Sequence, residues 1–218
     1  MNRLGILFAV AVIAMVGTTV ASASVIGTYN FFGLVDLPAP ATSVAPGVTV
    51  SNLIEGFGSR FTVVNTPTTN TPGDVMRFQY YDRNYVSEAQ AIAGEVYIQF
   101  TVTPSSAIDF ETISWTGSAD TTSASRHITF FVRSSADNYA STLDSKTYAS
   151  LHPQYPASLD ISYLGGVTSA TTFRMYYYDD SNSGGLVFVD DLTINGVPEP
   201  ATMGLLAMGG LALIRRRR

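Results

Sequence analysis

The 218-residue chain contains no cysteine, only two histidines and a single lysine, and 13% of its residues are charged, compared with about 25% in ordinary soluble proteins. Without cysteine it cannot form disulfides, thiolate metal sites, iron–sulfur clusters or a cysteine nucleophile. It also has neither G-x-S-x-G nor H-E-x-x-H, the motifs of serine hydrolases and zinc proteases. We therefore expect a protein that is not an enzyme.

The N-terminus has the pattern of a secretory signal peptide. Arg3 provides a positive start, residues 4–16 are apolar or small, and Ala21 and Ala23 are the small residues that signal peptidase accepts at positions −3 and −1. The apolar run is shorter than the ~20 residues that span a bilayer. We predict a signal peptide over residues 1–23, removed by signal peptidase after Ala23. The alternative is an N-terminal anchor that is retained.

The C-terminus contains three blocks in a fixed order. Pro198, Glu199 and Pro200 come first, residues 201–214 carry no charge, and four arginines end the chain. The uncharged block would form about 21 Å of helix, against a bilayer core of ~30 Å, and the arginines would stay cytoplasmic. This pattern predicts a short transmembrane helix that anchors the protein transiently in the inner membrane.

These three blocks together resemble the PEP-CTERM sorting signal of exported bacterial proteins. The resemblance implies that an exosortase, an integral-membrane cysteine protease, recognises Pro198, Glu199 and Pro200 and processes the protein there. It also implies a Gram-negative host that makes extracellular polysaccharide. The protein would then reside in the cell envelope, at the cell surface or in the medium. The alternative is an ordinary tail anchor that is never cleaved.

Residues 24–197 carry a sparse negative charge. They hold 16 of the 17 acidic residues and 7 of the 12 basic ones, a formal charge of −9. Because phosphate binding needs a basic patch, this balance argues against nucleic acid as a partner. It is compatible with a neutral glycan or a divalent cation.

Apolar residues in this segment repeat every second position, as in half-buried antiparallel strands. The clearest runs are 96–102, 128–132, 171–178 and 186–194, and the best helix candidate, 87–92, is short. We predict an all-β domain over residues 24–196, an antiparallel β-sandwich of the jelly-roll type with nine to eleven strands. The expected core contains Val96, Ile98, Phe100, Ile113, Ile128, Phe130, Val132, Phe173, Met175 and Phe188. The segment 113–194 also resembles the body of many PEP-CTERM proteins, which is similar to galactose-binding-like jelly rolls.

Oxygen-donating side chains suggest a calcium site. Asp179 opens a turn rich in Asp, Ser, Asn and Gly, and counting it as the first ligand puts Asp190 at position twelve of a degraded EF-hand pattern. By analogy with jelly-roll modules, Asp190 or Asp191 could instead hold a structural calcium. The alternative is a plain hairpin loop without metal.

Aromatic side chains could form a platform for sugar rings. Tyr176 and Tyr178 alternate with Phe173, Met175 and Tyr177, and we expect them to face away from the core beside Arg174. Trp115 is a further candidate, although its place on a period-two strand also fits the core.

Two functions remain open after these observations. The leading one is a non-enzymatic surface or matrix protein associated with extracellular polysaccharide. The alternative is a lectin-like module that binds a particular glycan, with or without calcium.

Overall fold

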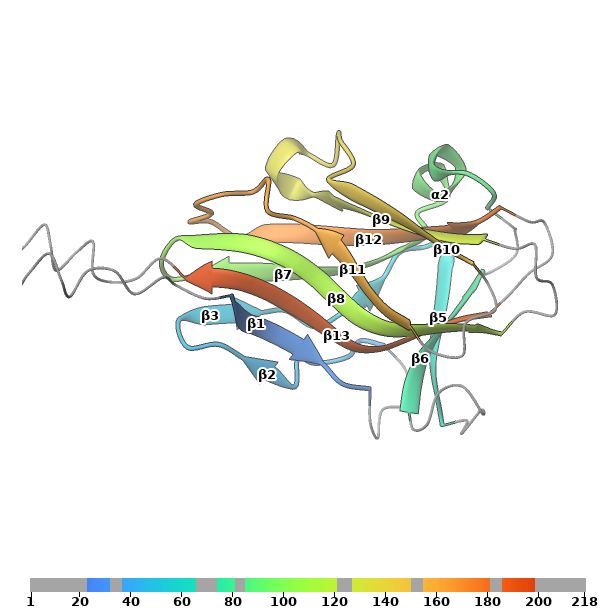
Figure 1. Ribbon diagram of the computed structural model, residues 1–218, viewed down its shortest axis with the longest axis horizontal. Coiled ribbons are helices and arrows are strands. Elements are labelled where there is room, and N and C mark those ends of the chain that lie inside the picture. The colour runs from blue at the N-terminus through green and yellow to red at the C-terminus, as the bar shows by residue number, and fades with distance from the viewer. Residues whose placement is uncertain are drawn as a thin grey trace, which may run out of the picture.

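The computed structural model describes residues 23–31, 37–65, 74–80, 85–120, 127–149, 155–180 and 186–198, which form two facing antiparallel sheets (Figure 1). This arrangement is a β-sandwich, and it confirms the predicted all-β antiparallel class. Residues 1–22 of the predicted signal peptide and the tail from Glu199 onward lie outside the described residues.

The first sheet contains seven strands among the described residues. They are β1 (Ser24–Tyr29), β2 (Ser43–Val44), β5 (Ser59–Asn65), β6 (Asp74–Tyr80), β8 (Ile108–Asp120), β11 (Tyr155–Asp160) and β13 (Leu186–Pro198). Their order is β11-β8-β13-β1-β2, with β6 also paired to β13 and β5 paired to β6. The long strand β13 therefore runs through the middle of this sheet, between β8 on one side and β1 and β6 on the other.

The second sheet contains six strands in the described part of the chain. They are β3 (Val48–Val50), β4 (Ile54–Glu55), β7 (Tyr97–Pro104), β9 (His127–Ser134), β10 (Asp144–Ala149) and β12 (Thr171–Asp179). Their order is β10-β9-β12-β7-β3, and β4 also pairs with β7. Strand β12 is central, with β9 and β7 as its neighbours.

Two short helical segments accompany the second sheet. Helix α2 (Glu88–Ala93) begins after Ser87, whose side chain accepts a hydrogen bond from the Gln90 amide, and it ends at Gly94. This agrees with the short helix predicted over 87–92. A single 3-10 turn, η1 (Ser135–Asp137), follows β9. Among the described residues, no helix is long and apolar enough to cross a membrane.

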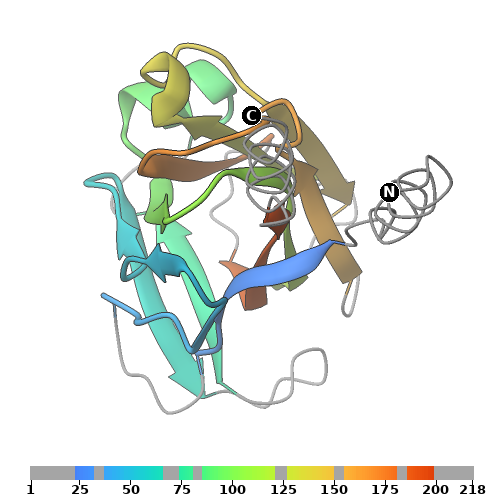
Figure 2. The same ribbon diagram turned by 90° about the vertical axis from the view of Figure 1, so that its left-hand side faces the viewer.

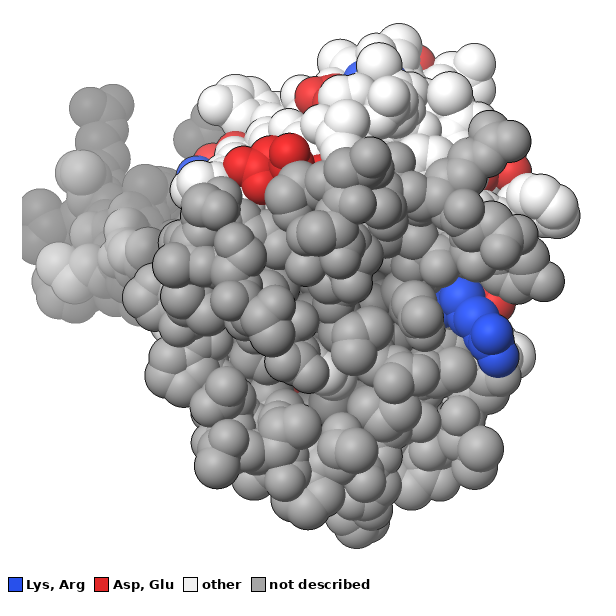
Figure 3. Space-filling view, turned by 90° about the vertical axis from the view of Figure 1, so that its right-hand side faces the viewer, with Lys and Arg blue, Asp and Glu red and all other residues white. Residues whose placement is uncertain are grey.

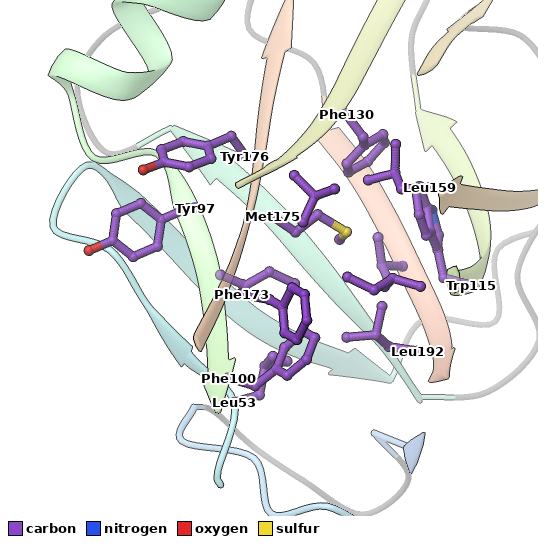
Figure 4. Packing of buried hydrophobic residues seen from close by; sticks show 14 of the residues in the cluster. Leu53, Tyr97, Phe100, Trp115, Phe130, Leu159, Phe173, Met175, Tyr176 and Leu192 are labelled. Atoms are coloured by element: carbon purple, nitrogen blue, oxygen red, sulfur yellow. The ribbon is translucent and has the colours of Figure 1, made fainter. Parts of the chain in front are cut away.

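The core lies between the two sheets (Figure 4). All ten residues predicted from the period-two pattern are at most 4% exposed, so this prediction is confirmed. Phe173 packs against Phe100 and Phe110 with ring centroids 5.5 and 5.1 Å apart, which joins β12 to β7 and to β8 of the other sheet. Phe188 is buried but lies outside this central cluster.

A bulge in β13 keeps its apolar side chains on the core side. Val187 and Val189 belong to the core cluster, and so do Leu192 and Ile194, although strict alternation from Val189 would turn residues 191 and 193 inward. The register shifts between Asp190 and Thr193, and Asp191 adopts φ 50°. The extra residue therefore corrects the phase of the strand.

Candidate functional site

The outer face of β12 combines polar and aromatic side chains from several strands of the second sheet. Phe173, Met175 and Tyr177 alternate with Arg174 and Tyr176, and of the last two Tyr176 is also buried. Across the sheet, Arg174 pairs with Gln99 and Arg133, and Tyr176 pairs with Tyr97 and Phe131. Figure 4 shows Tyr97 and Tyr176 side by side, near helix α2. Polar and aromatic side chains are thus brought together on one face.

The guanidinium of Arg174 lies between two tyrosine rings. Its central carbon is 4.5 Å from the ring centroid of Tyr97 and 4.0 Å from that of Tyr139, and its Nε donates a hydrogen bond to Gln99 Oε1 at 3.1 Å. Burial raises the pKa of Tyr97 above its usual value, so this ring is neutral at physiological pH. We call Tyr97, Gln99, Tyr139 and Arg174 the Arg174 cluster.

Tyr139 reaches Arg174 because its loop adopts an uncommon backbone. Asn138 and Tyr139 have φ 57° and 60°, a left-handed conformation that is unfavourable for a tyrosine. Asp137 holds the turn by accepting hydrogen bonds from the amides of Ala140 and Ser141, at 3.2 and 2.9 Å, and from the Ser141 hydroxyl. The hydroxyl contact is the largest influence that keeps the pKa of Asp137 below its usual value. Strain of this kind is often found at functional sites.

Arg133 attaches helix α2 and the Tyr139 loop to the sheet. Its Nη2 donates to Glu88 Oε1 at 2.9 Å, its Nη1 donates to the Tyr139 carbonyl at 2.9 Å, and its Nε donates to Thr142 Oγ1 at 3.1 Å. Burial acts to raise the pKa of Glu88, but the hydrogen bonds from Thr142 and Arg133 and the charge of Arg133 outweigh it and lower that pKa. Arg133 therefore supports the position of Tyr139.

Arg174 differs from Arg133 in its charge balance. In the described part of the chain the ion pairs join Arg133 to Glu88 and Lys146 to Asp144, the His127 ring contacts Asp180, and none of these contacts includes Arg174. At the right-hand end of the molecule, the described acidic and basic side chains lie in small separate groups (Figure 3). The Arg174 cluster thus contains a fixed cation whose charge no carboxylate among the described residues neutralises.

The predicted sugar platform is only partly placed as expected. Tyr176 and Tyr178 lie opposite the core side chains of β12, but Tyr178 is partly exposed whereas the Tyr176 ring is only 2% exposed. Its ring is stacked on Phe131 and meets the edge of Tyr97. Trp115 is 3% exposed and packs on Phe130 in the core, at 4.9 Å between centroids. Neither the Tyr176 ring nor the Trp115 ring can stack on a sugar in this structure.

The predicted calcium ligands Asp179, Asp190 and Asp191 lie in described strands, whereas residues 181–185 of the turn between them lie outside the described residues. Across the described ranges, no group of three or more His, Asp or Glu side chains could hold a metal ion. Asp179 is buried at the end of β12, and its amide donates to the Tyr85 carbonyl. Asp190 accepts a hydrogen bond from the Asp191 amide inside the β13 bulge. The Asp190 carboxylate therefore has a local structural role in the bulge.

Three members of the Arg174 cluster, Tyr97, Gln99 and Tyr139, escaped the sequence prediction. Tyr97 begins a period-two strand, and its pairing with Tyr176 could have been found only from the strand register. Tyr139 lies in a polar loop, and nothing in the sequence signals that it turns back over the sheet. Arg174 itself was predicted on the correct face.

The comparison with protein families identifies the C-terminal segment. Residues 196–218 match the PEP-CTERM protein-sorting motif, and this confirms the resemblance noted above. The chain is therefore an exported protein with a C-terminal PEP-CTERM sorting tail. No curated protein matches the chain in sequence.

Similar solved structures share little sequence with the chain. The CBM22-1 xylan-binding domain of Xyn10C from Paenibacillus barcinonensis is 12% identical at a TM-score of 0.45, covering 83% of this chain and 99% of that one. The CBM22-1 and GH10 modules of xylanase 10B from Clostridium thermocellum, complexed with xylohexaose, are 12% identical at 0.44, covering 78% and 28%. An arabinose-bound GH51 α-L-arabinofuranosidase is 11% identical at 0.43, covering 79% and 27%. The chain thus spans little more than a quarter of these two longer proteins.

Proposed function

We propose that the protein is a non-enzymatic component of the cell surface or extracellular matrix, processed by an exosortase-type enzyme and associated with extracellular polysaccharide. The observation that carries this proposal is the PEP-CTERM motif at residues 196–218. The partners are signal peptidase and an exosortase during export, and a polysaccharide afterwards. After transient anchoring in the inner membrane, the sandwich is released to the envelope, the surface or the medium.

The start of the sandwich supports the first boundary of the predicted division into residues 1–23, 24–196 and 197–218, whereas β13 runs to Pro198 and crosses the second. Ala23 is exposed and precedes β1 directly, so a cut after Ala23 leaves every residue of β1 in the mature protein. Ala21 lies outside the described residues. Removal of the signal peptide would therefore cost the sandwich none of its strands.

The Arg174 cluster supports the alternative, a lectin-like module. Tyr139 is partly exposed and its ring is fixed by the contact with Arg174, and aromatic faces bind the apolar faces of sugars. Gln99 and Arg174 supply amide and guanidinium groups for hydroxyl or carboxylate oxygens. In this proposal Tyr139 takes the role first predicted for Tyr176. The galactose-binding-like jelly-roll type and the calcium dependence remain predictions.

Export and processing can be tested in a bacterium that carries an exosortase. We expect the full chain to appear outside the cell without residues 205–218, as measured by intact mass spectrometry. Glu199→Ala should keep the protein in the membrane fraction, whereas Glu111→Ala, which removes an acidic side chain from β8, should not. An extracellular protein that still carries residues 205–218 would contradict the proposal.

A glycan array separates the two functions. The secreted protein is applied with calcium and with EDTA, and saturable binding to defined glycans favours the lectin-like module. Co-sedimentation with the host polysaccharide in the absence of array binding favours the matrix protein. Absence of both contradicts an association with polysaccharide.

A further inference from the structure

The sorting motif and the last strand of the sandwich overlap. The motif begins at residue 196, but β13 continues to Pro198. Its last three residues pair with the start of β8: Gly196 with Phe110, Val197 with Asp109 and Pro198 with Ile108. The first part of the sorting signal is therefore a component of the folded sheet.

Pro198 fits this strand because it lies at a position of the β8–β13 ladder where no amide hydrogen is needed. Ile108 exchanges hydrogen bonds with Val167, through its amide at 3.0 Å and its carbonyl at 2.9 Å, on the side of β8 away from β13. In an antiparallel pair, such a residue requires no amide hydrogen from its partner on the other side. Proline, which has no amide hydrogen, can thus close the strand without leaving an unpaired group on Ile108.

Gly196 is held closely from two sides. A Cβ at this position would lie 2.7 Å from the Asp109 carbonyl oxygen and 3.2 Å from the Cα of Phe110. On its other side Gly196 pairs with Ser24 in β1, and the Ser24 hydroxyl donates to the Gly196 carbonyl at 3.2 Å. The backbone of residue 196 is therefore enclosed between β8 and β1.

A protease needs access to an extended and unpaired backbone, and proteolysis concentrates where a chain is exposed or opens locally. The backbone of β13 is paired with β8 up to Pro198 and also with β1 up to Gly196, so it is not free to enter a protease. We propose that the processing position lies after Pro198, so that the mature protein keeps β13 whole. This inference rests on the proposed function. It adds that the folded strand, and not the sorting motif alone, determines how close to the sandwich the chain can be cut.

The N-terminal processing position lies at the same end of the sandwich. Figure 2 looks onto this end, where β1 begins and β13 ends. Ser24, the predicted first residue of the mature chain, pairs with Gly196. A cut before residue 196 would therefore remove pairing partners from both β1 and β8. A cut after Pro198 would leave every described pairing of β13 intact.

Intact mass spectrometry of the protein released by an exosortase-bearing host tests this inference. We expect a C-terminus at Pro198 or beyond, and a mature chain that ends at Val197 or earlier would overturn the inference. A released chain that retains its entire tail would contradict the proposed function instead.

Limited digestion of the purified full chain in detergent with proteinase K tests the same boundary without an exosortase. The stable product should retain residues 196–198, and a stable product that lacks them would overturn the inference. This second measurement decides the question even if no processing occurs in the host.

Two glycines near Asp109 provide a test variant and a matched control. Gly196→Ala should force the strand away from Asp109 and speed the digestion of residues 195–198 by about tenfold, since proteolysis follows the population of the opened state. Gly165→Ala also adds a Cβ near Asp109, but at an ordinary 3.7 Å from its side-chain oxygen, and should leave the rate unchanged. Equal digestion rates for the two variants would overturn the inference.

Discussion

Tyr176 stacks on Phe131 with ring centroids 4.9 Å apart and ring planes within 7° of parallel. Because β12 and β9 are neighbours, this contact lies on the outer face of the second sheet, next to helix α2. The outer face of this sheet is therefore a second packed layer, smaller than the core between the sheets.

Removal of the Tyr176 ring should destabilise the protein as a core substitution does. Tyr176→Ala is expected to lower the free energy of unfolding by about 3–5 kcal/mol, because the side chain is buried and its neighbours cannot fill the space. Tyr176→Phe should cost only about 1 kcal/mol, for the lost hydroxyl. Chemical denaturation measures both, and equal stability of Tyr176→Ala and the wild type would contradict the packed layer.

Tyr139→Gly should separate binding from folding. It removes the ring over Arg174 but relieves a left-handed tyrosine, which costs about 1–2 kcal/mol, so that the melting temperature should change little. Binding to the host polysaccharide should fall about fivefold, since one stacked ring contributes on the order of 1 kcal/mol. Tyr163→Gly is the control, because this tyrosine is 76% exposed and outside the cluster. Equal loss in both variants would exclude a specific role for Tyr139.

The ion pair between Glu88 and Arg133 predicts that the stability of the protein depends on pH. The pKa of Glu88 is lowered in the folded protein, so its contribution is present above the unfolded value of 4.5 and is lost as the pH falls through the folded value. At pH 7, Glu88→Gln should be less stable by about 1 kcal/mol or less, because water screens the 39% exposed side chain. The difference should shrink below pH 4.5 and in 1 M NaCl. A difference that grows on acidification would contradict this assignment.

The bulge in β13 predicts an unusual tolerance at Asp191. Its φ of 50° lies in the left-handed region, which glycine adopts without cost and β-branched residues avoid. Asp191→Gly should therefore keep or slightly raise the melting temperature, whereas Asp191→Val should destabilise the protein by about 1–2 kcal/mol. A higher melting temperature for Asp191→Val than for Asp191→Gly would contradict the idea that the bulge restricts the backbone at residue 191.

The period-two pattern predicted the core well because alternation is a property of the strand itself. Phe173 and Met175 share one face of β12 whatever its partners are, so their common burial could be predicted without knowledge of the neighbouring strands. Strand β11 escaped prediction, because it is a short edge strand that contains Pro156. Its strand conformation follows from pairing with β8, which only the folded chain shows.

The outer face could be predicted only in part, because its surroundings come from distant segments. Alternation placed Tyr176 opposite the core, as the structure does, but the exposure of its ring depends on Phe131 and Tyr97. The position of Tyr139 depends on two left-handed residues and on Arg133, which lies six positions earlier in the chain. Backbone angles of this kind leave no periodic trace in a sequence.

The pairing of Ser24 with Gly196 has a mechanical consequence. Hydrogen bonds in an antiparallel ladder run perpendicular to the strands, so tension applied at the start of β1 and the end of β13 opens their ladder one rung at a time. Tension between Pro198 and the Arg174 cluster instead crosses both sheets and must separate many contacts at once. The sandwich should therefore resist tension between Pro198 and the Arg174 cluster better than tension between its own two ends.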